Sequence, residues 1–262
     1  MARGGTAPRA LTSFLQQRND APVPSPPRSP AREAIAVWAT VMGVLAAVRI
    51  AGLAVPVLHG LVGALAVAAF LYAPMKPLER RGQDAHDAGW RFDRLRSDVA
   101  WALLACAVIL PPFTLGFWWF VRELPRLPPP VASLLAPYVG AAHPLRFRLG
   151  PDPVDLFGRI AGNAAVAFSE EFFYRGYMTL RLEERWPPSG RVLGAPLGRA
   201  AALGAALFAL GHLLEPAPWR LAVFFPALVF AWLRARTGTI VGAAICHFLF
   251  NVWLLLLERA AF

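Results

Sequence analysis

The sequence predicts an all-α fold, a polytopic transmembrane helical bundle of about seven spans. The first observation is composition. Of the 262 residues, 57% are hydrophobic and only 16% are charged, whereas a soluble domain carries about 25% charged residues. The second observation is that the charges cluster between long apolar runs. Together these features favour a membrane protein over the alternative, a soluble protein with a large core.

Seven apolar runs support the prediction, and most approach the roughly 20 residues that a helix needs to cross a bilayer. These runs are 34–54, 56–75, 99–121, 155–181, 199–214, 218–234 and 238–258. The third run contains Pro111 and Pro112, where we expect a kink, because proline removes a helical hydrogen bond. The fifth run is short, so it either extends further than these bounds or does not fully cross.

The runs divide the chain into four regions. Residues 1–33 are rich in Pro and Arg and predict a disordered cytoplasmic tail. Residues 34–121 form the amino-terminal transmembrane helices. The Pro-rich region 122–154 includes VASLLAPYVGAA, which is too short to span and predicts an interfacial or re-entrant helix. Residues 155–258 form a transmembrane core that contains the polar motifs described below.

The distribution of Lys and Arg predicts the orientation. With the amino terminus in the cytoplasm, the cytoplasmic segments hold 17 of these residues and the opposite loops hold 6, as the positive-inside rule requires. The net charge of +10 does not indicate nucleic-acid binding, because the arginines sit in short loops and not on one basic face. Cys106 and Cys246 lie inside apolar runs and are interpreted as packing residues.

The stretch EEFFYR places three charges inside an apolar run, where ionisable side chains are rare and costly. On a helix, Glu171 and Arg175 are four residues apart with the acid first, which predicts an ion pair. Glu170 is rotated by about 100° from Glu171, so it is the carboxylate left without a local partner. The alternative is that all three charges only hold helices together.

Two further motifs, FALGH and HFLFN, lie in later runs. The first places Phe208 and His212 one turn apart, and the second does the same for His247 and Asn251. Because His and Asn are costly against lipid, we expect them to face the bundle interior. Each motif alone is also compatible with a packed histidine or a helix–helix hydrogen bond.

Counting along the helices from their cytoplasmic ends puts three groups at similar depth. At about 1.5 Å per residue, Glu170, His212 and His247 lie roughly 16, 20 and 13 Å deep. Three helices could therefore bring them to one polar chamber. There Glu170 could act as general base on a water, and an imidazole or amide could bind an oxyanion.

The same three groups, Glu170, His212 and His247, could instead bind zinc and leave a position for water. The H-E-x-x-H signature of many zinc proteases is absent from the sequence. The residues alone therefore predict no certain cofactor and leave zinc open.

The ordered motifs resemble those of the type II CAAX prenyl protease family, also called the CPBP or Abi family of intramembrane proteases. EEFFYR is similar to its E-E-x-x-x-R motif, FALGH to F-x-x-x-H and HFLFN to H-x-x-x-N. The resemblance covers residues 170–251, and residues 1–150 carry no family motif. It implies a glutamate-dependent endopeptidase that cleaves near the carboxyl terminus of a membrane-associated protein or peptide.

The resemblance also implies a role for each motif residue. Glu170 would activate the water and His212 would assist it, while His247 and Asn251 would bind the oxyanion. The supporting positions are the expected ion pair of Glu171 and Arg175 and the packing residue Phe208. The resemblance leaves open whether the reaction needs a metal.

The high content of Ala, Arg and Pro is typical of a GC-rich bacterial genome. We therefore expect a multi-pass protein of the bacterial inner (plasma) membrane, with its amino terminus in the cytoplasm. Bacterial relatives are linked to bacteriocin self-immunity, peptide maturation and the processing of carboxyl-terminal sorting signals. The stretch EEFFYRGYM is most similar to members of the last kind. The expected partners are a membrane-associated peptide substrate and the lipid bilayer, with no nucleic acid.

Two other functions fit the same residues. A transporter or proton pathway would also use buried Glu and His, and it predicts polar residues aligned through the full membrane thickness. A non-catalytic scaffold predicts that Glu170→Gln is silent, whereas replacing Glu171 or Arg175 disrupts the fold.

Overall fold

The computed structural model describes residues 29–135, 153–215 and 217–261, and this part of the chain is almost entirely helical. Most of the predicted tail and most of the stretch VASLLAPYVGAA lie outside the described residues. The first described helix begins at Pro30, inside the range predicted for the tail. Proline is well suited to the first turn of a helix, because its missing N–H would have no helical partner there.

The elements follow one another along the chain with short connections. In order they are α2 (Pro30–Gly52), α3 (Pro56–Tyr72), α4 (Met75–Glu79), α5 (Leu95–Glu123), η1 (Leu124–Arg126), α6 (Pro129–Leu134), α8 (Pro153–Glu171), η2 (Phe172–Met178), α9 (Thr179–Arg185), β1 (Gly190–Val192), β2 (Ala195–Leu197), α10 (Arg199–Gly211), η3 (His212–Leu214), η4 (Pro218–Val223), α11 (Phe224–Thr237) and α12 (Val241–Ala261).

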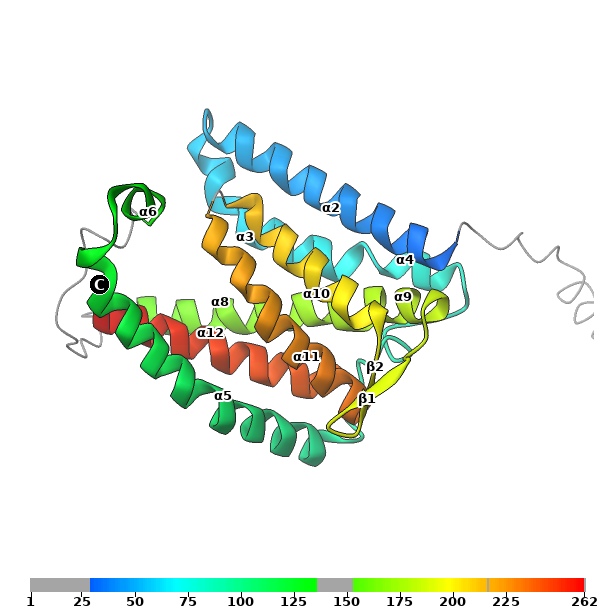
Figure 1. Cartoon of the computed structure of the whole chain (residues 1–262). Coiled ribbons are helices and arrows are strands. Elements are labelled where there is room, and N and C mark those ends of the chain that lie inside the picture. The colour runs from blue at the N-terminus through cyan, green and yellow to red at the C-terminus, as the bar shows by residue number, and fades with distance from the viewer. Residues whose placement is uncertain (1–28, 136–152, 216, 262) are drawn as a thin grey trace, which may run out of the picture.

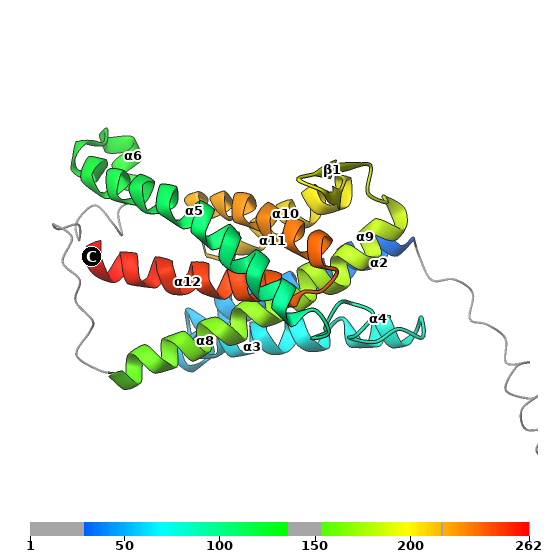
Figure 2. The same ribbon diagram turned by 90° about the horizontal axis from the view of Figure 1, so that it is seen from below.

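The helices pack side by side as a bundle, as Figures 1 and 2 show from two directions. Helix α12 contacts α5, α8 and α11, whereas α2 contacts α3 and α9. The start of α2 and the end of α12 lie at opposite ends of the bundle (Figure 1). This arrangement places the polar motifs of α8, α10 and α12 within one set of packed helices.

All seven predicted apolar runs are mainly helical, and within the described residues four helices are long and apolar enough to cross a membrane. These four are Pro30–Gly52, Gly60–Glu79, Leu95–Arg126 and Val241–Ala261. The apolar segment Arg199–Leu214 is shorter, as the sequence predicted for the fifth run. The all-α membrane bundle is therefore confirmed, but the count of about seven spans is not.

Helix α5 continues through Pro111 and Pro112. The hydroxyl of Thr114 donates a hydrogen bond to the carbonyl of Leu110 at 2.7 Å, one residue before the two prolines. Figure 1 shows that the helix bends along its length. The proline pair therefore bends the helix without ending it.

The stretch Phe172–Met178 forms a π-helical segment, η2, between α8 and α9. All seven of its residues are buried, and Phe173, Tyr177 and Met178 have no exposed surface. Segments of this type insert an extra residue into a helix and often occur at functional sites. The sequence predicted an ordinary helix here, so the local geometry of the first motif is a finding of the structure.

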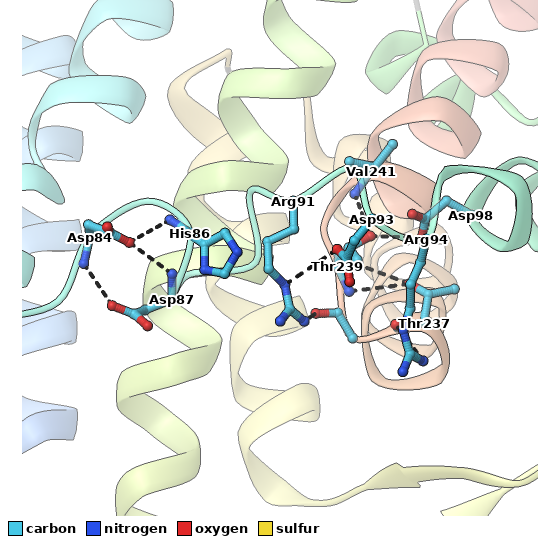
Figure 3. Close-up of polar contacts among 11 residues, drawn as sticks. Asp84, His86, Asp87, Arg91, Asp93, Arg94, Asp98, Thr237, Thr239 and Val241 are labelled. Atoms are coloured by element: carbon cyan, nitrogen blue, oxygen red, sulfur yellow. Dashed lines mark hydrogen bonds and ion pairs between the residues drawn. The ribbon is translucent and has the colours of Figure 1, made fainter.

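The loop of residues 80–94, which joins α4 to α5, packs against the turn between α11 and α12 (Figure 3). Arg91 donates to the carbonyl of Gly238 at 2.8 Å, and the hydroxyl of Thr239 donates to the buried carboxylate of Asp98 at 2.7 Å. The hydroxyl of Thr239 also accepts from the amide of Val241, the first residue of α12, at 3.2 Å. These bonds fix the start of the helix that carries His247.

Strands β1 and β2 form a small antiparallel hairpin, outside the seven predicted apolar runs. Leu193 and Gly194 occupy its turn with φ of 47° and 81°, as in the tight turns that join short antiparallel strands. The indole of Trp232 in α11 donates to the carbonyl of Val192 at 2.9 Å and ties the hairpin to the bundle.

Candidate active site

The three sequence motifs lie on three packed parts of the bundle. Glu170 and Glu171 end α8 and Arg175 lies in η2, whereas Phe208 is in α10 and His212 begins η3. His247 and Asn251 lie one turn apart on α12. Segment η2 contacts α8, α10 and α11, and α8 also contacts α12.

Glu171 is the centre of the polar contacts. Arg175 donates to its Oε1 oxygen at 2.9 Å, and both side chains are buried, with 3% and 0% of their surface exposed. The structure therefore contains the ion pair expected from the spacing. His247 Nδ1 lies 2.9 Å from the same oxygen, so Glu171 holds a second motif residue that the sequence did not assign to it.

The contact between His247 and Glu171 defines which imidazole nitrogen carries hydrogen. Because Glu171 accepts from Arg175 as a carboxylate, His247 Nδ1 must be the donor in this pair. The other nitrogen, Nε2, lies 3.7 Å from Oε2 of Glu170. This separation exceeds a direct hydrogen bond, and it is compatible with a bridging water.

The two carboxylates differ in access. The Glu170 side chain keeps 14% of its surface exposed, whereas Glu171 keeps none. Glu170 also makes no hydrogen bond to any residue in the described part of the chain. Glu170 is thus the carboxylate available to a small molecule, and Glu171 holds neighbouring side chains.

Two phenylalanines enclose the charged groups. The Phe230 ring stacks on His247, with 4.6 Å between ring centroids and 18° between the planes. The Arg175 guanidinium lies 4.4 Å from the Phe208 ring centroid and also donates to the carbonyl of Ala227 at 3.1 Å. These contacts hold the imidazole and the guanidinium in fixed orientations, and cation–π attraction adds to the second.

His212 joins this group through Phe208. Its Nδ1 lies 2.9 Å from the Phe208 carbonyl, which can only accept, so Nδ1 is the donor and Nε2 carries the lone pair. The Phe208 ring lies 4.6 Å from the His212 ring and 5.8 Å from the His247 ring. Phe208 therefore separates the two histidines and contacts both.

The structure brings the predicted site residues together to different degrees. Glu170, Glu171, Arg175 and His247 form one contiguous polar row, and His212 meets it through an aromatic ring. Asn251 is half-buried on α12, and within the described residues its side chain makes no hydrogen bond. Asn251 is assigned to the site because it lies one turn beyond His247 on α12.

The zinc alternative, with Glu170, His212 and His247 as ligands, stays a prediction. Glu170, His212 and His247 do not form a three-ligand cluster with all ligand atoms within 4.8 Å of one another, and in the described residues only Asp84, His86 and Asp87 do so. That exposed group lies in the α4–α5 loop, where Asp84 accepts from the amides of His86 and Asp87 (Figure 3). These bonds are those of a turn, and we assign no metal to it.

Comparison with known proteins supports the motif assignment. Residues 153–253 match the family described as type II CAAX prenyl endopeptidase, Rce1-like. The chain is similar to that family over this region. The match contains all three motifs and confirms the resemblance found in the sequence. No curated protein and no solved structure matches the chain.

The Rce1-like family is a family of CAAX-type intramembrane proteases, so the match supports a peptide hydrolase at the family level. Several residues that shape the site were not found from the sequence. Phe230 and Ala227 lie in α11, and they belong to no motif and carry no charge that would single them out. Only their packing in the structure connects them to His247 and Arg175.

Proposed function

We propose that the chain is an intramembrane endopeptidase that hydrolyses a peptide bond near the carboxyl terminus of a membrane-associated protein or peptide. The observation that supports this most strongly is the continuous row Arg175, Glu171, His247 and Glu170 inside the Rce1-like region. In this row only the last carboxylate lacks a hydrogen-bonded partner within the described residues.

Glu170 acts as general base in this proposal. It takes a proton from a water that attacks the scissile carbonyl, and it later returns that proton to the leaving amine. The products are a carboxylate and an amine, so the reaction consumes one water and needs no covalent intermediate with the enzyme. This water would bind beside Glu170 Oε2 and His247 Nε2, which lie 3.7 Å apart.

His247 and Asn251 stabilise the oxyanion. Because Nδ1 of His247 donates to Glu171, its Nε2 can donate to an oxyanion only when the ring is an imidazolium. Once Glu170 has taken the water proton, the row from Arg175 to Glu170 would carry one net positive charge, which the oxyanion balances. The amide of Asn251 provides a second donor. His212, with a free Nε2 lone pair, accepts a hydrogen bond from the water or the substrate and so assists Glu170.

The topology of the proposed protease follows the positive-inside rule. We propose seven crossings, with the loop of residues 80–94 and the β1–β2 hairpin in the cytoplasm and the end of α12 outside, in a bacterial inner membrane. The opposite placement of the two ends of the described chain supports an odd number of crossings.

A comparison of carboxyl termini in cells tests the activity. Membranes of cells that express the unaltered chain, Glu170→Gln or the control Glu79→Gln are analysed by mass spectrometry for carboxyl-terminal peptides. We expect a set of shortened termini that requires Glu170 and is unaffected by Glu79, an exposed residue of α4. Identical termini in cells with the unaltered chain and with Glu170→Gln would reject the protease and favour a scaffold.

A further inference from the structure

Tyr174 lies between the helix that carries Glu170 and the helix that carries His212. Its ring meets the Phe208 ring edge-on, with 5.0 Å between centroids, and the Phe208 carbonyl accepts from His212 at 2.9 Å. Its hydroxyl lies against Gly211, where an added methyl carbon would come within 2.9 Å of the oxygen. Tyr174 therefore contacts Phe208, whose carbonyl accepts from His212, and Gly211, the residue before His212.

A second side chain fixes the Tyr174 hydroxyl. The indole Nε1 of Trp38 donates to this oxygen at 3.2 Å. Indole can only donate, so the phenol oxygen is the acceptor and its position is set by Trp38. Tyr174 is 2% exposed, and a buried phenol that lacked this bond would be costly.

Trp38 and its neighbour Met42 belong to α2. The Met42 sulfur lies 3.2 Å from the same methyl position at Gly211. One face of α2 thus contacts the phenol oxygen and the end of α10, and α2 also packs against both η2 and η3. Helix α2 lies outside residues 153–253, the region that matches the protease family.

We propose that Tyr174 is a positioning residue that holds His212 at its working distance from Glu170, and that Trp38 of α2 orients Tyr174 for this task. Tyr174 is four residues after Glu170, so one short segment connects the general base with the support of His212. The amino-terminal helix α2 is therefore part of the working site. This inference rests on the proposed protease activity.

The first set of variants removes the hydrogen bond with little change of shape. Tyr174→Phe, Trp38→Phe and the double variant are compared in proteoliposomes with a synthetic peptide that contains a cleavage site mapped in cells. A farnesylated CAAX peptide serves as a second probe. We expect each single variant to lower kcat about tenfold and to leave KM within about twofold. The double variant should be no slower than the slower single variant. Both changes remove the same hydrogen bond between Trp38 and Tyr174, so their effects on kcat should not add.

The second set tests the contact at Gly211. Gly211→Ala should lower kcat, because its methyl group meets the Tyr174 oxygen. Combining it with Tyr174→Phe removes that oxygen. The Met42 sulfur, 3.2 Å from the methyl position, lies at the end of a flexible side chain that can shift, so kcat should return to the level of Tyr174→Phe alone. Gly204→Ala is the matched control on the same helix. Its added methyl group would meet no neighbouring atom within 4 Å, so this variant should keep full activity.

The outcomes separate the two proposals. If Glu170→Gln keeps its activity, the protease proposal fails and the role of Tyr174 fails with it. If Glu170→Gln is inactive but Tyr174→Phe and Trp38→Phe are fully active, only the positioning role is wrong. The positioning role is also rejected if these variants lose kcat only in proportion to a loss of folded protein, measured by melting temperature in detergent.

Discussion

Arg175 and Glu170 sit five residues apart, yet their environments assign them different tasks. Arg175 bonds Glu171 and the Ala227 carbonyl and lies over the Phe208 ring. Glu170 has no such partners in the described chain. Charge in a buried position is tolerated when it is paired, so we infer that the Glu171–Arg175 pair supports the fold and that Glu170 is the carboxylate left for the proposed chemistry.

This difference predicts a contrast between two variants. Arg175→Gln leaves Glu171 buried without its main countercharge, and we expect it to cost about 3–5 kcal/mol of stability together with activity. Glu170→Gln should abolish cleavage and leave stability nearly unchanged. Melting temperatures in detergent and cleavage assays on the same preparations test both statements. Equal loss of stability in the two variants would contradict the division of roles.

At the scale of elements, the π-helical segment η2 depends on a close approach by the α4–α5 loop. Gly176 lies under the backbone of Ala88, where an added methyl carbon would come within 2.9 Å of the carbonyl oxygen. Trp90 of the same loop packs edge-on against Phe168 and Phe172, with 4.5 and 5.3 Å between centroids. The loop therefore covers the segment that carries the first motif.

Gly176→Ala should lower the free energy of unfolding by about 1–3 kcal/mol, because backbone must move to admit the methyl group. Gly162→Ala is the matched control on the preceding helix, where the structure leaves open space and alanine favours the helix. The two melting temperatures are compared in one detergent. If Gly176→Ala melts no lower than Gly162→Ala, the loop does not restrain η2.

At the scale of the whole molecule, the proposed seven crossings require the two ends of the bundle to face opposite sides of the membrane. A reporter inserted in the β1–β2 turn at Gly194 should be cytoplasmic, and one fused after Arg259 should be outside. Fusions to a cytoplasm-active fluorescent protein and to a periplasm-active phosphatase measure this. Both reporters on one side would exclude an odd number of crossings between the β1–β2 turn and the end of α12.

The sequence predicted the all-α membrane bundle and the family resemblance for identifiable reasons, and the roles of the site residues stay predictions. Helical spacing is enough to pair Glu171 with Arg175, and the membrane makes each buried polar residue conspicuous. The family match then confirms the assignment of EEFFYR, FALGH and HFLFN to one family.

Other features depend on tertiary packing and left no signal in the chain. Phe230 on His247 and Trp38 on Tyr174 are contacts between distant helices, formed by residue types that are common in any membrane span. The π-helical geometry of η2 is likewise not encoded by a motif. The shared oxygen of Glu171 could not be foreseen, because spacing along one helix says nothing about α12.

The central claim is that Glu170 activates the water that cleaves the peptide. The most direct measurement is the cleavage rate of one mapped peptide by purified protein in proteoliposomes, for the unaltered chain, Glu170→Gln and the control Glu79→Gln. We predict cleavage by the unaltered chain and by the control, and no cleavage above background by the folded Glu170→Gln variant. Cleavage by Glu170→Gln at the unaltered rate would contradict it.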